Sequence, residues 1–412
     1  MSKNRILIVN HIFWPDNINT ARHITELADE LSYRSWNVSV LVGNRDYRSN
    51  EIIGSNFEKR AEVKISRVFI PKFSNKKNAG RLLTSLWLIF SFAFKLPFLG
   101  KFDAIVLGSN PPFSFFLAPY LKLINRNTKL FLWSFDLYPD AIYASKNANS
   151  IFFGKLLNKI TVFCYKNLDV LVDIGPCMKY RLKKYVANNI TTETLTPWSF
   201  VEQTVKDEIH IPTRNMLFGE ANLTLMYTGT IGHAHEFDNF LALARILQKK
   251  NASIAFCFAG FGKKINELKS LCNSNDINIS FAEFVNSDKE LNERLSSADI
   301  MMVSLKDNWS GISVPSKFFT SIGTGKPVLY SGAKDSAIES WIREYNLGFH
   351  LTKDNIDLVS IKLIDISNNS HLINDMKSNC LESYKNTFSK KYICDKWSTL
   401  IWNTIHIDKS IL

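Results

Sequence analysis

A lysine at the start of a predicted helix is the residue of this sequence best suited to chemistry. Lys317 lies in the run Val314-Pro-Ser-Lys-Phe-Phe-Thr-Ser-Ile-Gly-Thr-Gly-Lys-Pro-Val328. Pro315 favours the first turn of a helix, whereas the later glycines and proline end it. Backbone N–H groups near Ser316 and Lys317, the helix dipole and the ammonium would converge on one point, which suits a diphosphate. An ordinary helix-to-strand connection is the alternative interpretation.

Two glycine loops follow predicted strands in the same half of the chain. The first is Tyr227-Thr-Gly-Thr-Ile-Gly232, and the second is Phe258-Ala-Gly-Phe-Gly-Lys-Lys264. Ligands of open parallel sheets bind outside the carboxyl ends of the strands, and glycine lets the backbone approach a phosphate closely. A plain turn explains the first loop equally well, and Lys263 in the second can be a solvated surface charge.

Polar residues also follow predicted strands in the first half of the chain. Asn110 and Asp136 should meet at one sheet edge, where a ligand of the sheet would bind. Capping of the next helix is the alternative for Asp136. Asn19 or Thr20 is predicted to cap a helix over Ala21–Leu31, which places Arg22 in its first turn. The predicted binding residues of this half are Trp14, Asn17, Arg22, Asn110 and Asp136.

Short apolar runs that alternate with helical patterns must position these residues. Such a pattern predicts parallel sheets covered on both faces, and 412 residues suffice for two Rossmann-like domains. We predict a first domain over residues 1–198, a linker over 199–221, a second domain over 222–388 and a C-terminal helix over 389–412. The predicted strands are Ile6–Val9, Val38–Val42, Ala104–Leu107, Leu130–Trp133, Val170–Asp173, Leu223–Tyr227, Ile254–Phe258, Ile300–Val303 and Val328–Tyr330.

Several strings in a fixed order give the chain a family resemblance. It resembles the GT-B glycosyltransferases, specifically the retaining family-four enzymes that build bacterial surface polysaccharides such as O-antigen and capsule. The resemblance implies two domains that face a cleft and a C-terminal helix that crosses back to the first domain. Besides the Lys317 run, the strings are Ile6–Val9 with His11–Pro15, Asp136–Asp140, Pro197–Phe200, Tyr227–Gly232, Phe258–Gly262 and Ser297–Val303.

The resemblance also implies that the first domain binds the acceptor, with Asp136 binding sugar hydroxyls or acting as a base, and that the second domain binds the donor. There, Phe284 and Val285, after a predicted strand over Ile277–Phe281, would contact the base, and Thr320 would bond a ribose hydroxyl. His233 stands where the family usually has a more basic residue, and Ile312 and Thr320 occupy the positions of two family glutamates. The implied donor-binding residues are Gly229, Thr230, Gly232, His233, Gly260, Lys263, Phe284, Val285, Pro315, Ser316, Lys317 and Thr320.

The composition of the sequence limits the cellular compartment and the binding partners that we expect for this protein. The six cysteines form no Cys-x-x-Cys pair, and neither a structural metal nor an Asp-x-Asp pair for a metal-bound diphosphate is indicated. No secretion signal precedes the first predicted strand, so we expect a cytoplasmic protein. The net charge of +12 fits a nucleotide diphosphate or an anionic membrane better than nucleic acid, because no nucleic-acid-binding motif occurs. No cofactor besides the nucleotide-sugar substrate is expected.

The segment Leu82–Phe94 is the most hydrophobic window and is predicted to dock on a membrane. It is shorter than the ~20 residues that span a bilayer. Its apolar side chains would enter the headgroup region while basic neighbours attract anionic lipid. A buried helix that covers the sheet is the alternative. The basic neighbours are Lys72, Lys76, Lys77, Arg81, Lys95 and Lys101.

Together these patterns predict a metal-independent hexosyltransferase. It would move a sugar, from UDP by preference, to a lipid-linked saccharide at the inner face of the cytoplasmic membrane, with retention. Asp136 and Lys317 would be the catalytic residues. A non-catalytic GT-B scaffold or partner subunit and a nucleotide-sugar 2-epimerase are the alternatives, because Ile312 and Thr320 replace the glutamate pair.

Overall fold

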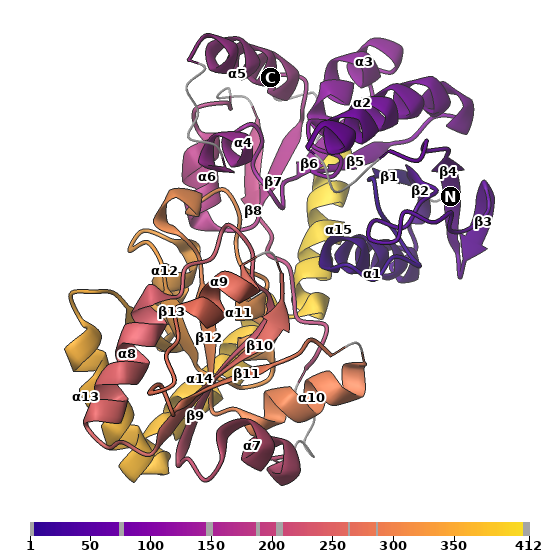
Figure 1. The fold of residues 1–412 in the computed structure, drawn as a ribbon. Helices are drawn as coiled ribbons and strands as arrows, with labels where there is room; N and C mark the ends of the chain where they lie inside the picture. The colour runs from indigo at the N-terminus through magenta and orange to yellow at the C-terminus, as the bar shows by residue number, and fades with distance from the viewer. Residues whose placement is uncertain are drawn as a thin grey trace. The chain divides into compact units, whose positions relative to one another are not determined.

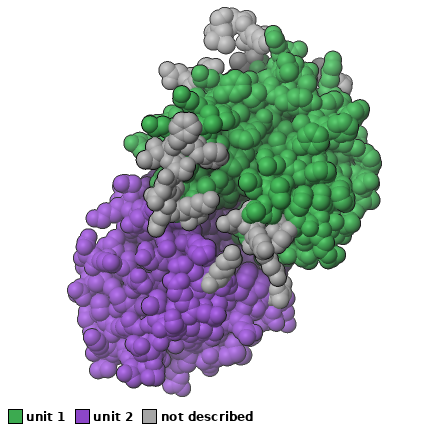
Figure 2. All heavy atoms as spheres, turned by 45° about the horizontal axis from the view of Figure 1, so that its top comes forward, with its two compact units in different colours: residues 1–196, 311–313, 393–412 green, residues 197–310, 314–392 purple. Residues whose placement is uncertain are grey.

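A computed structural model describes residues 4–73, 78–145, 151–186, 190–202, 209–262, 264–285 and 287–406. The chain divides into two compact units (Figure 2). Unit 1 comprises residues 1–196, 311–313 and 393–412, and unit 2 comprises residues 197–310 and 314–392. The interval predicted as a linker contains helix α7 (Ile211–Phe218), whose Leu217 and Phe218 are buried in the core of unit 2.

Unit 1 is built on an eight-stranded sheet in the order β3-β4-β2-β1-β5-β6-β7-β8 (Figure 1). Neighbouring strands are parallel except for the hairpin of β3 and β4. The five strands predicted here from apolar runs are confirmed. The hairpin and β8 were not predicted, because their sequences are largely polar. The strands are β1 (Arg5–Val9), β2 (Asn37–Gly43), β3 (Phe57–Arg60), β4 (Val63–Val68), β5 (Ala104–Gly108), β6 (Lys129–Trp133), β7 (Val170–Asp173) and β8 (Thr191–Thr194).

Helices cover both faces of this sheet. Right-handed crossovers place α1 on one face and α2, α3 and α5 on the other (Figure 1). The C-terminal helix α15 packs beside α1, where the Trp36 indole N–H donates to Ser398 Oγ at 2.9 Å. The predicted return of this helix to the first domain is thereby confirmed. The helical segments are α1 (Asn19–Tyr33), α2 (Asn78–Lys95), η1 (Leu96–Leu99), η2 (Ser114–Phe116), α3 (Leu117–Ile124), α4 (Asp140–Ser145), α5 (Ile151–Tyr165), α6 (Pro176–Leu182) and α15 (Lys390–His406).

Unit 2 is built on a fully parallel six-stranded sheet in the order β11-β10-β9-β12-β13-β14. Its central strands are largely apolar, as expected of strands buried on both faces. Besides the four predicted apolar strands, the strand predicted over Ile277–Phe281 is confirmed as β11, and β14 at the edge was not predicted. The strands are β9 (Leu223–Thr230), β10 (Ile254–Phe261), β11 (Ile279–Ala282), β12 (Ile300–Ser304), β13 (Val328–Ser331) and β14 (Gly348–Leu351).

The helices of unit 2 bury amphipathic faces on this sheet. Ser287 caps α10 and Ser336 caps α12 by accepting N–H hydrogen bonds from Glu290 and Glu339, respectively. One core joins the sheet to α8 and α13, and a second joins it to α7 and α10. Besides α7, the helical segments are α8 (Asp238–Lys249), α9 (Ile265–Ser270), α10 (Asp288–Ser297), η3 (Asp307–Trp309), α11 (Lys317–Gly323), α12 (Ala337–Tyr345), α13 (Ile356–Asn368), η4 (Ser370–Ile373), α14 (Asn374–Ser383) and η5 (Tyr384–Phe388).

The fold predicts a strong stabilising role for one residue of α15. Trp397 is fully buried, with its ring centroid 5.1 Å from that of Trp133 in β6. We expect Trp397→Ala to lower the free energy of unfolding of unit 1 by about 3–5 kcal/mol, since truncation of a buried aromatic leaves a cavity. Denaturant unfolding measures this loss. Trp402→Ala on the same helix is the control, because that side chain is 53% exposed. Equal losses in the two variants would contradict the packing described here.

Candidate functional site

Close contact between two glycine loops shapes the carboxyl edge of the unit 2 sheet. A side chain at Gly260 would collide with the carbonyl oxygen of Gly229, and one at Gly262 would collide with that of Ile231. Gly229 and Gly262 also adopt φ angles of +108° and +142°, which L side chains rarely adopt. The ends of β9 and β10 lie so close together that only glycine fits at these positions. The loop after β9 therefore presents backbone that is not covered by side chains at its glycines.

Lys317 extends across this glycine loop from the first position of α11. Its Nζ lies 3.4 Å from the Thr230 carbonyl oxygen and 4.9 Å from the centre of the Tyr227 ring. Its Cε would lie 3.2 Å from a Cβ on Gly229, so the ammonium stem rests against the loop. Loss of hydration lowers the pKa of the ammonium to about 8. Within the described residues Lys317 forms no salt bridge, so an anionic ligand could supply its counter-charge.

A neutral histidine holds the far end of the same loop. His235 Nδ1 accepts a hydrogen bond from the Gly232 N–H at 3.0 Å, which leaves the ring proton on Nε2. Burial, and to a lesser extent the charge of Lys317, lowers the pKa of His235 to about 3. His233, the residue selected from the sequence, is exposed beside it. Sequence reasoning therefore missed the role of His235, whose spacing from Gly232 is that of a turn-closing side chain.

Two partly exposed aromatic rings lie near the ends of β10 and β11. Phe261 and Phe284 pack edge to face, with ring centroids 4.5 Å apart. Phe284 was predicted to contact a base, and Phe261 was not selected. Val285, Pro315, Ser316 and Thr320 are all half-buried, the last three at the start of α11. Lys263 lies outside the described residues.

The corresponding edge of unit 1 is lined by hydrogen-bonded polar groups. The His11 N–H donates to the Asn110 carbonyl oxygen at 2.6 Å, and the two side chains approach to 3.3 Å. Burial lowers the pKa of His11 to about 4, so its imidazole is neutral. Asp16 is also buried, and its Oδ2 accepts the Tyr47 N–H at 2.8 Å. These contacts join the loops after β1, β2 and β5, and the sequence had pointed only to Asn110.

Asp136 lies on the same edge, after β6. Its own N–H donates to Ser109 Oγ at 3.4 Å, and its backbone forms a bridge with Ser313. The carboxylate accepts no hydrogen bond from a described residue, and α4 begins only at Asp140, so Asp136 does not cap that helix. Desolvation raises the pKa of Asp136, to about 6 at most, because the side chain keeps contact with water. The carboxylate is thus available to a ligand.

The other residues predicted for the acceptor are spread along the loop after β1. Asn17 is exposed, and Trp14 is partly exposed with its ring 5.3 Å from the Arg60 guanidinium carbon. Arg22 lies in the first turn of α1, as predicted. The predicted cap is wrong: Ile18 precedes the helix without a side-chain cap, because Asn19 is already helical and its carbonyl oxygen lies 2.7 Å from His23 Nδ1.

Residues 311–313 belong to unit 1, although the flanking sequence belongs to unit 2. The Ile312 carbonyl oxygen accepts the Leu137 N–H at 2.9 Å, and the Ile312 side chain is buried. A side chain at Gly311 would lie 2.6 Å from the Cys177 carbonyl oxygen, and its φ is +73°. The apolar residue at the position of a family glutamate is therefore part of the packing next to Asp136.

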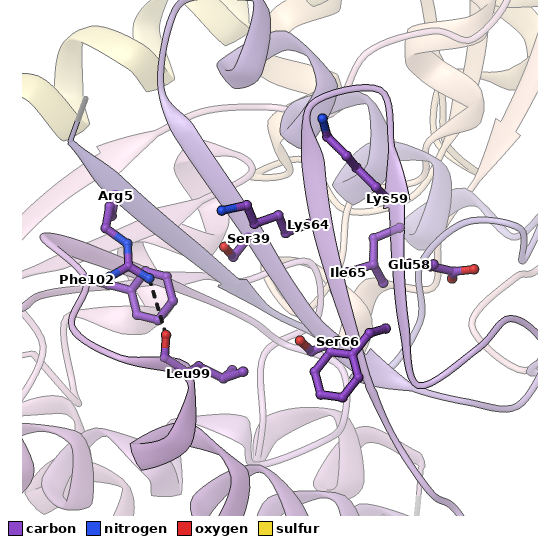
Figure 3. A pocket seen from close by; sticks show the side chains of 10 residues that line it. Arg5, Ser39, Glu58, Lys59, Lys64, Ile65, Ser66, Leu99 and Phe102 are labelled. Atoms are coloured by element: carbon purple, nitrogen blue, oxygen red, sulfur yellow. Dashed lines mark hydrogen bonds between the residues drawn. The ribbon is translucent and has the colours of Figure 1, made fainter. Parts of the chain in front are cut away.

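A hollow of about 550 Å³ opens elsewhere on unit 1 (Figure 3). Arg5 donates across it to the Leu99 carbonyl oxygen at 3.3 Å, and Ser39, Lys64 and Phe102 also line it. Arg5 is the first residue of β1 and Ser39 lies within β2, so the hollow is away from the carboxyl edge that carries Asp136. We do not include it in the candidate site.

Comparisons with known proteins agree with this geometry. No family model matches the sequence. The chain is 24% identical over 286 residues to the probable glycosyltransferase WbjE of Pseudomonas aeruginosa, covering 68% of this chain and 70% of that protein. Its fold matches sucrose-phosphate synthase of Thermosynechococcus elongatus with a TM-score of 0.70 at 12% identity, over 97% of this chain and 99% of that one. It matches WaaG, a glycosyltransferase of lipopolysaccharide biosynthesis, with a TM-score of 0.61 at 14% identity, over 96% and 99%.

The fold is therefore the GT-B fold, with two Rossmann-like parallel-sheet domains and a C-terminal helix. Its sequence is similar to one probable glycosyltransferase, and its fold is that of solved glycosyltransferase structures. Its similarity to WbjE covers about two thirds of each chain.

The site predicts that Lys317 contributes to binding of a nucleoside diphosphate. We expect Lys317→Met to weaken UDP or GDP binding by about 1.5–3 kcal/mol, the range for a hydrogen bond to a charged group. Because the free ammonium has a pKa of about 8, affinity should fall as the pH rises through that value, well below the range of an ordinary lysine. Isothermal titration calorimetry across a pH series measures both effects.

Lys334→Met is the matched control, because Lys334 is an exposed lysine of the same unit. It should leave affinity and its pH dependence unchanged. Lys317→Arg should retain a cation at high pH and flatten the decline. Equal affinity in Lys317→Met and in the unaltered protein would remove Lys317 from the site.

Proposed function

We propose that this protein is a hexosyltransferase of bacterial surface-polysaccharide biosynthesis, such as that of O-antigen or capsule. It moves a sugar from a nucleotide diphosphate, preferably UDP, to a saccharide carried on a lipid at the inner face of the cytoplasmic membrane. The reaction proceeds with retention and without a metal ion. Unit 2 binds the donor, and the edge of unit 1 that carries Asp136 binds the acceptor.

The observation that carries this proposal is the environment of Lys317. A half-buried ammonium rests on a bare glycine loop, and no carboxylate among the described residues neutralises it. The neighbouring His235 is neutral, so Lys317 supplies the positive charge beside the Gly229–Gly232 backbone. A diphosphate offers the missing negative charge, and loop N–H groups offer it hydrogen bonds.

This arrangement suits departure of a nucleoside diphosphate. As the bond between the sugar C1 and the β-phosphate oxygen breaks, negative charge grows on that phosphate, where Lys317 stabilises it. The acceptor hydroxyl oxygen forms the new bond to C1 on the same face of the sugar. Its proton passes to the departing phosphate, and Asp136 orients the acceptor hydroxyls. The described residues contain no cluster of three or more His, Cys, Asp or Glu side chains suited to a metal, and we assign the charge-stabilising role to Lys317.

A non-catalytic GT-B scaffold is the second candidate, and Ile312 favours it. This apolar side chain is buried in unit 1 and offers no acceptor for a sugar hydroxyl. Thr320 is half-buried on α11 and retains a hydroxyl that can bond a ribose. If the protein does catalyse transfer, side chains other than Ile312 must accept hydrogen bonds from the sugar hydroxyls, and Asp136 is the leading candidate.

A panel of UDP-, GDP- and TDP-sugars, incubated with the protein, tests the proposal. Slow release of the nucleoside diphosphate from one donor, or transfer to a lipid-linked saccharide, supports a transferase. Tight binding without turnover supports the scaffold, and formation of an epimer supports an epimerase. NMR of the product's anomeric proton tests retention, and activity in the presence of EDTA tests independence from metal.

Asp136 provides a prediction with a pH signature. We expect Asp136→Asn to keep the melting temperature and to lower kcat/KM by about 100-fold, the loss expected when a reacting hydroxyl is no longer held in its productive orientation. In the unaltered protein, kcat/KM should fall as the pH drops through the pKa of Asp136, which desolvation raises to about 6, because the protonated carboxyl is a weaker hydrogen-bond acceptor for the hydroxyls. The variant should lose this acidic limb. Asp335→Asn, an exposed aspartate of unit 2, is the control. A lowered melting temperature with unchanged turnover per folded molecule would make Asp136 structural.

A further inference from the structure

Helix α2 is apolar on both its inner and its outer side. Leu88 and Phe92 are fully buried, beside Thr84 and Ser85, which donate to the carbonyl oxygens of Gly80 and Arg81, respectively. On the outer side, Phe90 and Phe94 are each 68% exposed. Burial in unit 1 therefore explains only the inner part of the apolar run. The exposed apolar side chains of α2 and the following η1 are Leu82, Leu83, Leu86, Trp87, Phe90, Phe94 and Phe98.

The stretch Ala79–Leu99 is long and apolar enough to cross a bilayer by length and composition. It is longer than the window recognised in the sequence, and only 28% of it is buried. However, α2 contacts β4 and α3 within unit 1. A helix that crossed a bilayer would lose these contacts with unit 1. The geometry therefore favours a helix that lies parallel to the membrane surface.

Two neighbouring helices continue the exposed apolar surface. Figure 1 shows α3 between α2 and α5, and α3 contacts both. Leu123 and Ile124 at the end of α3 are exposed. On α5 the exposed residues Leu156, Ile160 and Phe163 share one helical face. We call the exposed apolar residues of α2, η1, α3 and α5 the apolar face.

The segments that carry the apolar face have charged residues of one sign only. No Asp or Glu occurs in residues 71–102, 114–129 or 151–168, although the chain contains 38 acidic residues. Lys155, Lys159 and Lys166 are exposed next to the apolar stripe of α5, and Arg81 and Lys101 are exposed near the two ends of the α2 stretch. Lys76 and Lys77 lie outside the described residues. Apolar side chains bordered by cations match an anionic lipid surface, whereas two copies of one basic face would repel each other.

We propose that the apolar face inserts into the headgroup region of an anionic bilayer, with α2, α3 and α5 all in contact with lipid. The biological purpose rests on the proposed function, since a lipid-linked acceptor is held at such a surface.

Co-flotation with vesicles tests this proposal without any nucleotide sugar. We expect binding to phosphatidylcholine vesicles that contain phosphatidylglycerol, weaker binding to phosphatidylcholine alone, and partial loss in high salt. Phe90→Ser with Phe94→Ser on α2, and Ile160→Ser with Phe163→Ser on α5, should each reduce partitioning by about tenfold or more. These serine variants remove apolar area without changing charge.

The matched control is Leu358→Ser with Ile361→Ser, which removes two similarly exposed apolar side chains from α13 of unit 2. It should bind vesicles like the unaltered protein. Circular dichroism confirms that each variant is folded, and sedimentation velocity gives the oligomeric state. Full binding by the α5 variant would overturn the three-helix surface. If the unaltered protein is a dimer and the α2 and α5 variants are monomers, the apolar face is a dimer interface and not a lipid-binding surface. Release of nucleoside diphosphate without vesicles tests the transferase separately, so the two proposals can fail independently.

Discussion

Parallel pairing gathers the carboxyl ends of neighbouring strands at one edge of a sheet, and the candidate sites of both units depend on this constraint. In unit 2 it brings the loops after β9 and β10 together, where Gly260 must remain glycine because the Gly229 carbonyl occupies the space of a side chain. In unit 1 it joins the loops after β1, β5 and β6 through His11, Asn110 and Asp136. The same pairing requires buried crossover helices, which explains why most strands are apolar throughout.

The carboxyl edges of the two sheets differ in the charge of their candidate site residues. In unit 2 burial, and to a lesser extent the charge of Lys317, keeps His235 neutral, so Lys317 carries the positive charge beside the backbone loop. In unit 1 the carboxylate of Asp136 keeps contact with water and has a raised pKa. A cation suits a phosphate group, and a carboxylate suits sugar hydroxyls. This division of charge is the physical basis for assigning the donor to unit 2 and the acceptor to unit 1.

The apolar face of unit 1 conflicts with an ordinary aqueous surface. Helix α2 is apolar on its outer side as well as on its buried side, unlike the usual amphipathic helix of a soluble protein. Exposed apolar area of this kind marks an interaction surface, and the basic residues of the helices that carry it favour an anionic partner.

The sequence by itself determined the strand-and-helix alternation, the apolar strands and the helix that begins at Lys317, because apolar periodicity, proline and glycine act locally. It did not determine the largely polar edge strands β3 and β8 or the short edge strand β14, which are held by neighbouring strands. Candidate site residues divide in the same way. Lys317, Gly229 and Asp136 were selected because they follow strands or begin a helix, whereas the surroundings of Phe261 and His11 come from contacts with other loops and those of His235 from a turn in its own loop. Only the tertiary structure showed that Ile312 packs in unit 1 and that α2 is apolar on its outer side, since a sequence run carries no record of which side meets protein and which meets solvent.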